Sequence, residues 1–211
     1  MKKLILMLII LVSILSLTSC TEDEKANTNV ISETTLTDRE KTFLSIGSDE
    51  YFVFDFNVDE SYKWLEIWVE RYELGKMVSD GGRLSTGLSM TKEGLFLITV
   101  KEDEKMKSDW TISIQSNGAL YTGRSTQEYN ADDEPVFAKT WGANNSENIL
   151  INDNEIVLAS ICYKDQNKSS VMSSLTNDFY SNPDENLKEI EDYELVYLLK
   201  CKFYKNEKQY K

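Results

Sequence analysis

Hydrophobic and polar residues alternate with a period of two over several stretches of the chain, a pattern typical of β-strands that turn one face to a core. The alternation is clearest in residues 51–58 and 109–115. Asn117-Gly118 follows the second stretch at once, and this dipeptide strongly favours a β-hairpin turn. The expected core-facing residues of the two strands are Phe52, Phe54, Phe56 and Val58, and Trp110, Ile112 and Ile114.

Further strands are predicted along the rest of the chain. Residues 95–100 are apolar on both faces, which indicates a central strand. Residues 149–151 and 155–163 flank Asn152-Asp153-Asn154, a cluster of turn-forming residues. The last strand covers about residues 194–204 and places on one side Leu195, Tyr197, Leu199, Cys201 and Phe203.

Residues 62–74 fit two patterns. Leu65, Ile67 and Val69 alternate with larger or charged residues, as in a strand, but the aromatic residues between them also recur at helical spacing. The content of aromatic and β-branched residues favours the strand. Glu73-Leu74-Gly75-Lys76 would then be the turn of a hairpin.

One helix is signalled near the C-terminus. Asn182 suits the N-cap, Pro183 the first helical position and Glu185 the third, which predicts a helix to about Asp192. A second short helix is expected near residues 169–178. Many strands, short turns and one or two short helices predict a mostly β fold, an antiparallel β-sandwich of the immunoglobulin-like or jelly-roll-like kind.

The N-terminus has the features of an export signal. Residues 1–20 read MKKLILMLIILVSILSLTSC: two lysines precede a largely apolar run from Leu4 to Leu17, which is too short for a good membrane span of about 20 residues. Leu17-Thr18-Ser19-Cys20 resembles the lipobox of bacterial lipoproteins. In that family the peptide is cut before the cysteine, whose sulfur carries diacylglycerol. The resemblance covers only these 20 residues and implies a chain anchored through Cys20 to the extracytoplasmic face of the cell membrane.

The domain organisation follows from this interpretation. Residues 1–19 would be the signal peptide, and residues 20–42 the lipidated Cys20 with a flexible tether, because residues 21–41 contain no aromatic residue and few aliphatic ones. Residues 43–205 would form a single β-rich domain, with a possible subdivision at the acidic, proline-containing stretch 130–135. Residues 206–211 would be a polar tail.

Composition excludes several functions. The chain has no histidine, so a Ser-His-Asp triad, a Cys-His pair and an HExxH zinc site are impossible. The 36 acidic residues outnumber the 23 basic ones, and the net charge of −13 argues against binding nucleic acid through its phosphates. No cofactor-binding motif is present, and the acidic stretches match no known calcium loop, so no cofactor and no metal are predicted.

The most informative candidate for a binding site is one face of the strand predicted at residues 62–74. Aromatic rings alternating with carboxylates on a solvent-exposed strand face would bind a cationic peptide or stack on a glycan. The alternative is a sheet face whose aromatic residues are covered by other parts of the fold. The residues of this face are Trp64, Glu66, Trp68, Glu70 and Tyr72.

Two further cysteines, Cys162 and Cys201, lie in predicted strands. They could form a disulfide, which the extracytoplasmic location permits, or remain buried thiols that pack as small hydrophobic side chains.

The sequence as a whole predicts a membrane-anchored surface lipoprotein. Its β-rich domain would be a non-enzymatic binding, sensor or immunity-type module for a cationic peptide, a protein or a cell-surface glycan. The alternative is an extracytoplasmic hydrolase that uses carboxylates or a Ser-Lys pair, and a deep pocket with converging carboxyl groups of raised pKa would favour it.

Overall fold

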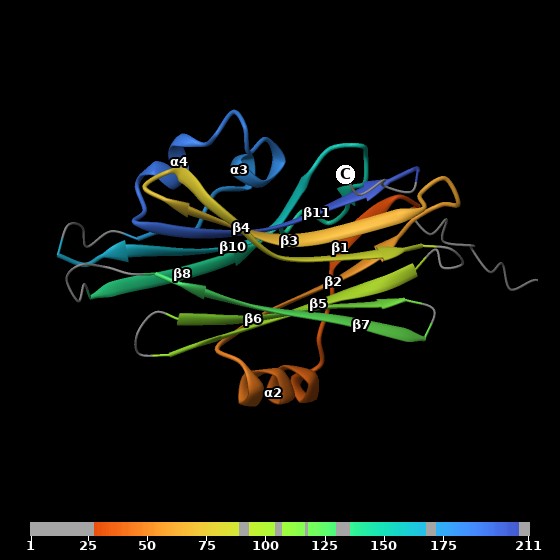
Figure 1. Cartoon of the computed structure of the whole chain (residues 1–211), viewed down its shortest axis with the longest axis horizontal. Coiled ribbons are helices and arrows are strands. Elements are labelled where there is room, and N and C mark those ends of the chain that lie inside the picture. Colours follow the sequence, from red (N-terminus) through yellow and green to blue (C-terminus); the bar gives the residue numbers. More distant parts are fainter. Residues whose placement is uncertain are drawn as a thin grey trace, which may run out of the picture.

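The computed structural model describes residues 28–88, 93–103, 107–116, 118–129, 136–167 and 172–206. These residues form two antiparallel sheets packed face to face, with a helix below one sheet and two helices above the other (Figure 1). The predicted signal peptide and Cys20 lie outside the described residues. No helix of the described part has the length and apolar composition needed to cross a membrane.

The first sheet has six strands in the order β7-β6-β5-β2-β1-β9. The predicted strands at residues 51–58, 95–100 and 109–115 are all confirmed in it, and the third forms a hairpin with β7. Gly118 in the turn has a φ of 71°, a conformation that glycine adopts without strain. The strands are β1 (Val30–Glu33), β2 (Glu50–Asn57), β5 (Glu93–Glu102), β6 (Lys107–Ser116), β7 (Ala119–Glu128) and β9 (Ile149–Leu150).

The second sheet has five strands in the order β4-β3-β11-β10-β8. Within residues 62–74, Trp64–Glu73 form a strand and not a helix, and the hairpin predicted at residues 73–76 joins it to β4. The bounds are β3 (Trp64–Glu73), β4 (Lys76–Gly87), β8 (Phe137–Ala143), β10 (Ile156–Asp165) and β11 (Leu195–Tyr204).

The predicted β-sandwich is therefore confirmed, and its main core lies between the sheets. One side of the sandwich is closed by β4 and β7, where Ser79 Oγ donates a hydrogen bond of 3.4 Å to Gln127 Oε1. The residues expected to face the core do so on both sheets, including Phe54, Trp110, Ile112, Ile114, Leu199 and Phe203.

The packing of β6 gives a direct test of this core. Ile112 is 2% exposed between the sheets, so replacing it with alanine removes buried methyl groups and leaves a cavity. Ile112→Ala should lower the free energy of unfolding by about 2–5 kcal/mol, measured by chemical denaturation. Thr111→Ala is the matched control, because Thr111 lies on the opposite face of the same strand and is only half-buried. Equal stability of the two variants would contradict the assignment of faces.

The predicted tether is wrong in its second half. Val30–Glu33 pairs with β2 and β9 inside the six-stranded sheet, and helix α2 (Asp38–Gly47) follows it. A capping box starts this helix: Thr37 Oγ1 accepts from the backbone N–H of Glu40, and the Glu40 carboxylate accepts from the backbone N–H of Thr37. The ordered domain thus begins before residue 43, even though the segment is mostly polar.

The C-terminal helices differ from the prediction. Helix α3 (Asn177–Ser181) ends with Asn182 as its C-cap, and Pro183 follows that cap as it commonly does at a helix end. Residues 183–185 form a turn, and helix α4 spans only Lys188–Glu191. The Asn186 amide donates to the carbonyls of Asp178 and Asn182, which holds the turn in place.

The two cysteines of the described domain are free thiols. Cys201 faces the core between the sheets, whereas Cys162 belongs to a second apolar cluster on the other side of the five-stranded sheet. The tentative disulfide between them is therefore wrong, because the two side chains point to opposite faces of one sheet. Burial raises the pKa of the Cys162 thiol to about 12.

The possible subdivision at residues 130–135 and the tail beyond residue 206 lie outside the described residues. Strands β7 and β8, on either side of the possible subdivision, belong to different sheets of the same sandwich.

Candidate functional site

Strand β3 places its side chains on two faces, as its alternation predicts. Leu65, Ile67 and Val69 have no exposed surface and fill the core between the sheets. The other set lies on the face turned away from the six-stranded sheet, which we call the outer face. The predicted exposure of that set is wrong: Trp64 is half-buried, and the exposed fractions of Glu66, Trp68, Glu70 and Tyr72 are 0, 1, 7 and 9%.

Glu66 is covered by side chains from the neighbouring strands. Its carboxylate accepts hydrogen bonds from Arg83 Nη1 at 3.1 Å, Ser85 Oγ at 3.1 Å and the Tyr204 hydroxyl at 2.9 Å. The Arg83 guanidinium also lies 4.3 Å from the centre of the Trp68 ring. A buried carboxylate is tolerated when its charge is paired and its oxygens are hydrogen-bonded, and Glu66 meets both conditions.

Glu70 is the centre of a second buried network. Its carboxylate accepts hydrogen bonds from Trp68 Nε1 at 2.9 Å and the Tyr72 hydroxyl at 2.7 Å, and Lys200 Nζ lies 2.8 Å away. Burial opposes ionisation of this carboxyl, but the hydrogen bonds from Lys200, Trp68 and Tyr72 outweigh it and hold its pKa below the ordinary value. The predicted binding residues therefore support the surface above them and are not themselves that surface.

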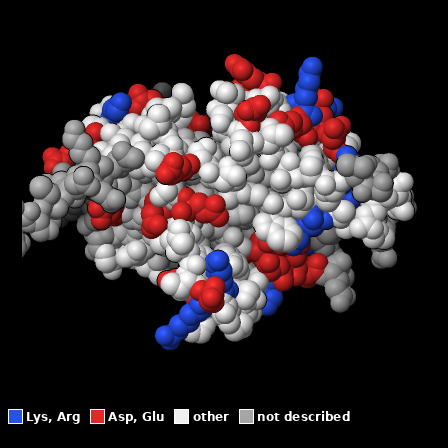
Figure 2. All heavy atoms as spheres, turned by 180° about the vertical axis from the view of Figure 1, so that it is seen from behind, with Lys and Arg blue, Asp and Glu red and all other residues white. Residues whose placement is uncertain are grey.

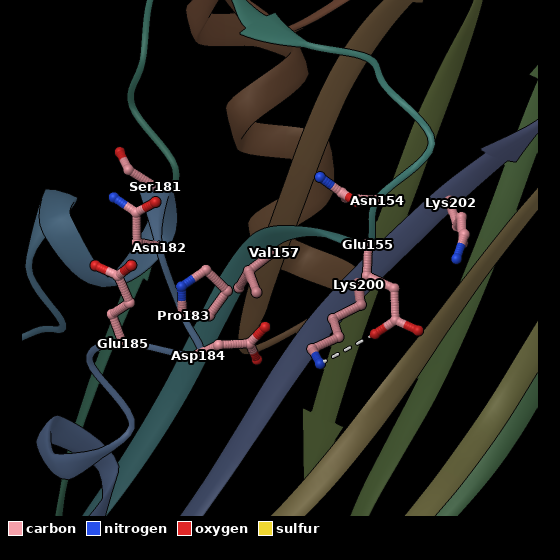
Figure 3. A pocket seen from close by; sticks show the side chains of 10 residues that line it. All are labelled: Asn154, Glu155, Val157, Ser181, Asn182, Pro183, Asp184, Glu185, Lys200 and Lys202. Carbon is pink, nitrogen blue, oxygen red and sulfur yellow. Dashed lines mark hydrogen bonds and ion pairs between the residues drawn. The ribbon is translucent and has the colours of Figure 1, made fainter.

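A groove with a volume of about 450 Å³ lies on the outer face, beside this network. Figure 3 shows the end of α3 and the following turn on one side, and the β9–β10 loop with strand β11 on the other. We call it the outer groove. It is lined by Asn154, Glu155, Val157, Ser181, Asn182, Pro183, Asp184, Glu185, Lys200 and Lys202.

The net charge of the outer groove is more negative than a count of its charged lining residues suggests. Three carboxylates and two ammonium groups line it, but Lys200 is held at 2.8 Å from the buried Glu70 and is 3.4 Å from Glu155. The pKa of the Tyr72 hydroxyl is raised by burial, by its hydrogen bond to Glu70, and by the charges of Glu155 and Asp184. Glu70 is thus the direct partner of this hydroxyl, while the charges of Glu155 and Asp184 act on it from the groove.

Sequence reasoning did not find the groove residues as a site. Residues 152–155 and 182–186 stand out as oxygen-rich, and the structure brings these two segments to opposite walls of the groove (Figure 3). Nothing in the sequence pairs two segments about 30 residues apart, or indicates that Lys200 lies between them. Within the described residues no group of histidine, cysteine, aspartate or glutamate side chains is arranged to hold a metal ion.

A second charged cluster lies at one end of the space between the sheets. Lys139 Nζ is 3.0 Å from Glu50 and 3.3 Å from Glu102, and the Tyr163 hydroxyl donates to Glu102. Burial raises the pKa of Glu50, although Lys139 partly offsets this effect. Two carboxyl groups therefore converge here, but an ammonium group stands between them.

The surface charge agrees with the composition. Figure 2 shows acidic side chains in several separate clusters spread over one face of the molecule, with basic side chains prominent at its top and at helix α2 at the bottom. A basic partner would therefore meet a favourable potential as it approaches.

Fold and site together define an antiparallel β-sandwich protein with a polar, predominantly acidic groove on its outer face. Residues 30–203 match the family model described as the YgaN domain, so the chain belongs to the YgaN domain family. The match begins at Val30, the first residue of β1, and ends in β11, so it spans both sheets. No curated protein and no solved structure matches the chain.

Proposed function

We propose that the chain is a lipid-anchored extracytoplasmic protein whose YgaN domain is a non-enzymatic module that binds a basic segment of a peptide or protein. The observation that carries the binding proposal is the outer groove, where Glu155, Asp184 and Glu185 line an open space. Of its two lysines, Lys200 is shared between the buried Glu70 at 2.8 Å and Glu155 at 3.4 Å. The anchoring proposal rests on the resemblance of residues 1–20 to a lipoprotein signal.

The groove favours a basic ligand over a glycan. A glycan site on this face would use exposed aromatic rings for stacking, but Trp68 and Tyr72 are buried beneath Arg83, Lys200 and the α3–α4 segment. Carboxylates at the rim remain accessible, since the Glu155 side chain is 49% exposed and Asp184 is exposed. A lysine or arginine of a ligand gains ion pairs there, and Asn154 and Asn182 offer amide groups for its backbone.

The proposal predicts that removing two rim carboxylates weakens binding of a basic peptide. The probe is the hexapeptide KSKSKS, and the protein is the chain from residue 21 onward, which retains every described residue, including both sheets and both apolar clusters. Combining Glu155→Gln with Asp184→Asn should lower the affinity about threefold to tenfold by isothermal titration at low salt. The difference should shrink at high salt because ions screen exposed charges.

The matched control changes the net charge equally on the other sheet. Glu93→Gln with Asp55→Asn removes two exposed carboxylates from the six-stranded sheet and should leave the affinity nearly unchanged. If this control weakened binding as much as the groove variant, the peptide would be responding to overall charge, and the groove would not be its site.

A further inference from the structure

We propose that the preferred ligand of the outer groove is a segment that is both cationic and apolar, a deeper claim that rests on the function proposed above. An exposed apolar surface continues from the groove onto the tip of the β3–β4 hairpin. We call it the hairpin patch; its members are 61, 57, 45 and 41% exposed and are Leu74, Met77, Val78 and Leu187.

The hairpin patch is one surface although its residues come from two segments. The backbone N–H of Leu74 donates to the Glu194 carbonyl at 3.3 Å, and a side chain at Gly75 would approach Glu191 Cγ to 2.6 Å. The tip of the hairpin, yellow in Figure 1, therefore lies against α4. Leu187 is the N-cap of α4, four residues before Glu191, the residue that the tip approaches at Gly75.

The patch and the acidic groove meet at Tyr72. Met77 is the direct cross-strand partner of Tyr72 on the outer face. The Tyr72 hydroxyl donates to Glu70 at 2.7 Å, and Glu70 lies 2.8 Å from Lys200, which lines the groove 3.4 Å from Glu155. Met77 is therefore connected to the groove through Tyr72, Glu70 and Lys200.

The acidic charge of the groove indicates which kind of partner binds to this surface. A second copy of the chain, with its net charge of −13, would bring further acid against the groove. A basic peptide with apolar residues between its cations places ammonium groups in the groove and apolar side chains on the hairpin patch. An extended hexapeptide is about 20 Å long, which is enough to contact both the outer groove and the adjoining hairpin patch.

The test compares two hexapeptides of equal charge, KLKLKL and KSKSKS, on the chain from residue 21 onward. The unaltered protein should bind KLKLKL about tenfold more tightly by isothermal titration, because two or three leucines lose water on the patch. Met77→Ser with Leu187→Ser should abolish that preference and leave the affinity for KSKSKS unchanged. The control, Leu120→Ser with Leu150→Ser, removes exposed leucines from the six-stranded sheet and should keep the preference.

The outcomes separate the two proposals. Equal affinity for the two peptides, with binding still reduced by the Glu155→Gln and Asp184→Asn changes, would overturn the apolar preference and leave the basic-ligand function standing. A preference that survives the patch variant, or one that the control also removes, would place the leucine contacts elsewhere and overturn the assignment to the hairpin patch. Failure of both peptides to bind would overturn the proposed function itself.

Discussion

Replacing Trp68 with alanine should lower the free energy of unfolding by about 3–5 kcal/mol, as expected for a large side chain removed from a packed interior. The Trp68 ring is 1% exposed, its Nε1 donates to Glu70 at 2.9 Å, and the Arg83 guanidinium lies over it. The variant therefore leaves a cavity, removes one hydrogen bond from a buried carboxylate and takes the packing partner from Arg83. Chemical denaturation followed by circular dichroism measures the loss.

Trp141→Ala is the matched control for Trp68→Ala. Trp141 lies on the edge strand β8 and is 51% exposed, so its removal should cost much less stability. Unchanged stability of Trp68→Ala would mean that the ring projects into solvent, as the sequence alone had suggested, and would contradict the buried network around Glu70.

Loss of Cys20 should abolish lipid attachment altogether. Diacylglycerol on this residue would supply two acyl chains, the number needed for stable anchoring. In a bacterial host that processes lipoproteins, Cys20→Ala should leave an unprocessed precursor that takes up no labelled palmitate. Electrophoresis with acyl labelling measures both effects.

Cys162→Ala separates lipidation from a general effect of losing a thiol. Cys162 has no exposed surface, so this variant should be processed and labelled like the unaltered chain. Normal processing and labelling of Cys20→Ala would refute the lipoprotein assignment without affecting the proposals for the groove.

The strands were the most predictable part of the fold. Trp110, Ile112 and Ile114 alternate with polar residues because one face of β6 packs on the other sheet, while the opposite face carries polar side chains that range from exposed to buried. The same reasoning failed on β3, where both faces are buried. Alternation shows that two faces differ, but it does not show whether the polar face meets water or a network built by distant residues such as Arg83 and Lys200.

Helices were harder to place because local signals compete. Asn182-Pro183 fits the start of a helix, yet the same pair ends α3, since Asn182 donates its backbone N–H to the Asp178 carbonyl. Conversely, Thr37 and Glu40 form a capping box that was readable from the sequence, but the polar character of residues 21–41 suggested a tether. The outer groove could not be predicted at all, because its walls come together only when β10 and β11 pair.

The two buried free thiols can be used to detect where the domain opens. Cys162 and Cys201 lie on opposite sides of the five-stranded sheet, each inside a different apolar cluster, and burial raises the pKa of both thiols. A thiol-reactive dye needs an accessible thiolate, so it reacts with either cysteine only after the surrounding layer separates. Cys162 reports the departure of the α3–α4 segment and Cys201 the separation of the two sheets, which lets one reagent distinguish loosening of the groove wall from loss of the sandwich itself.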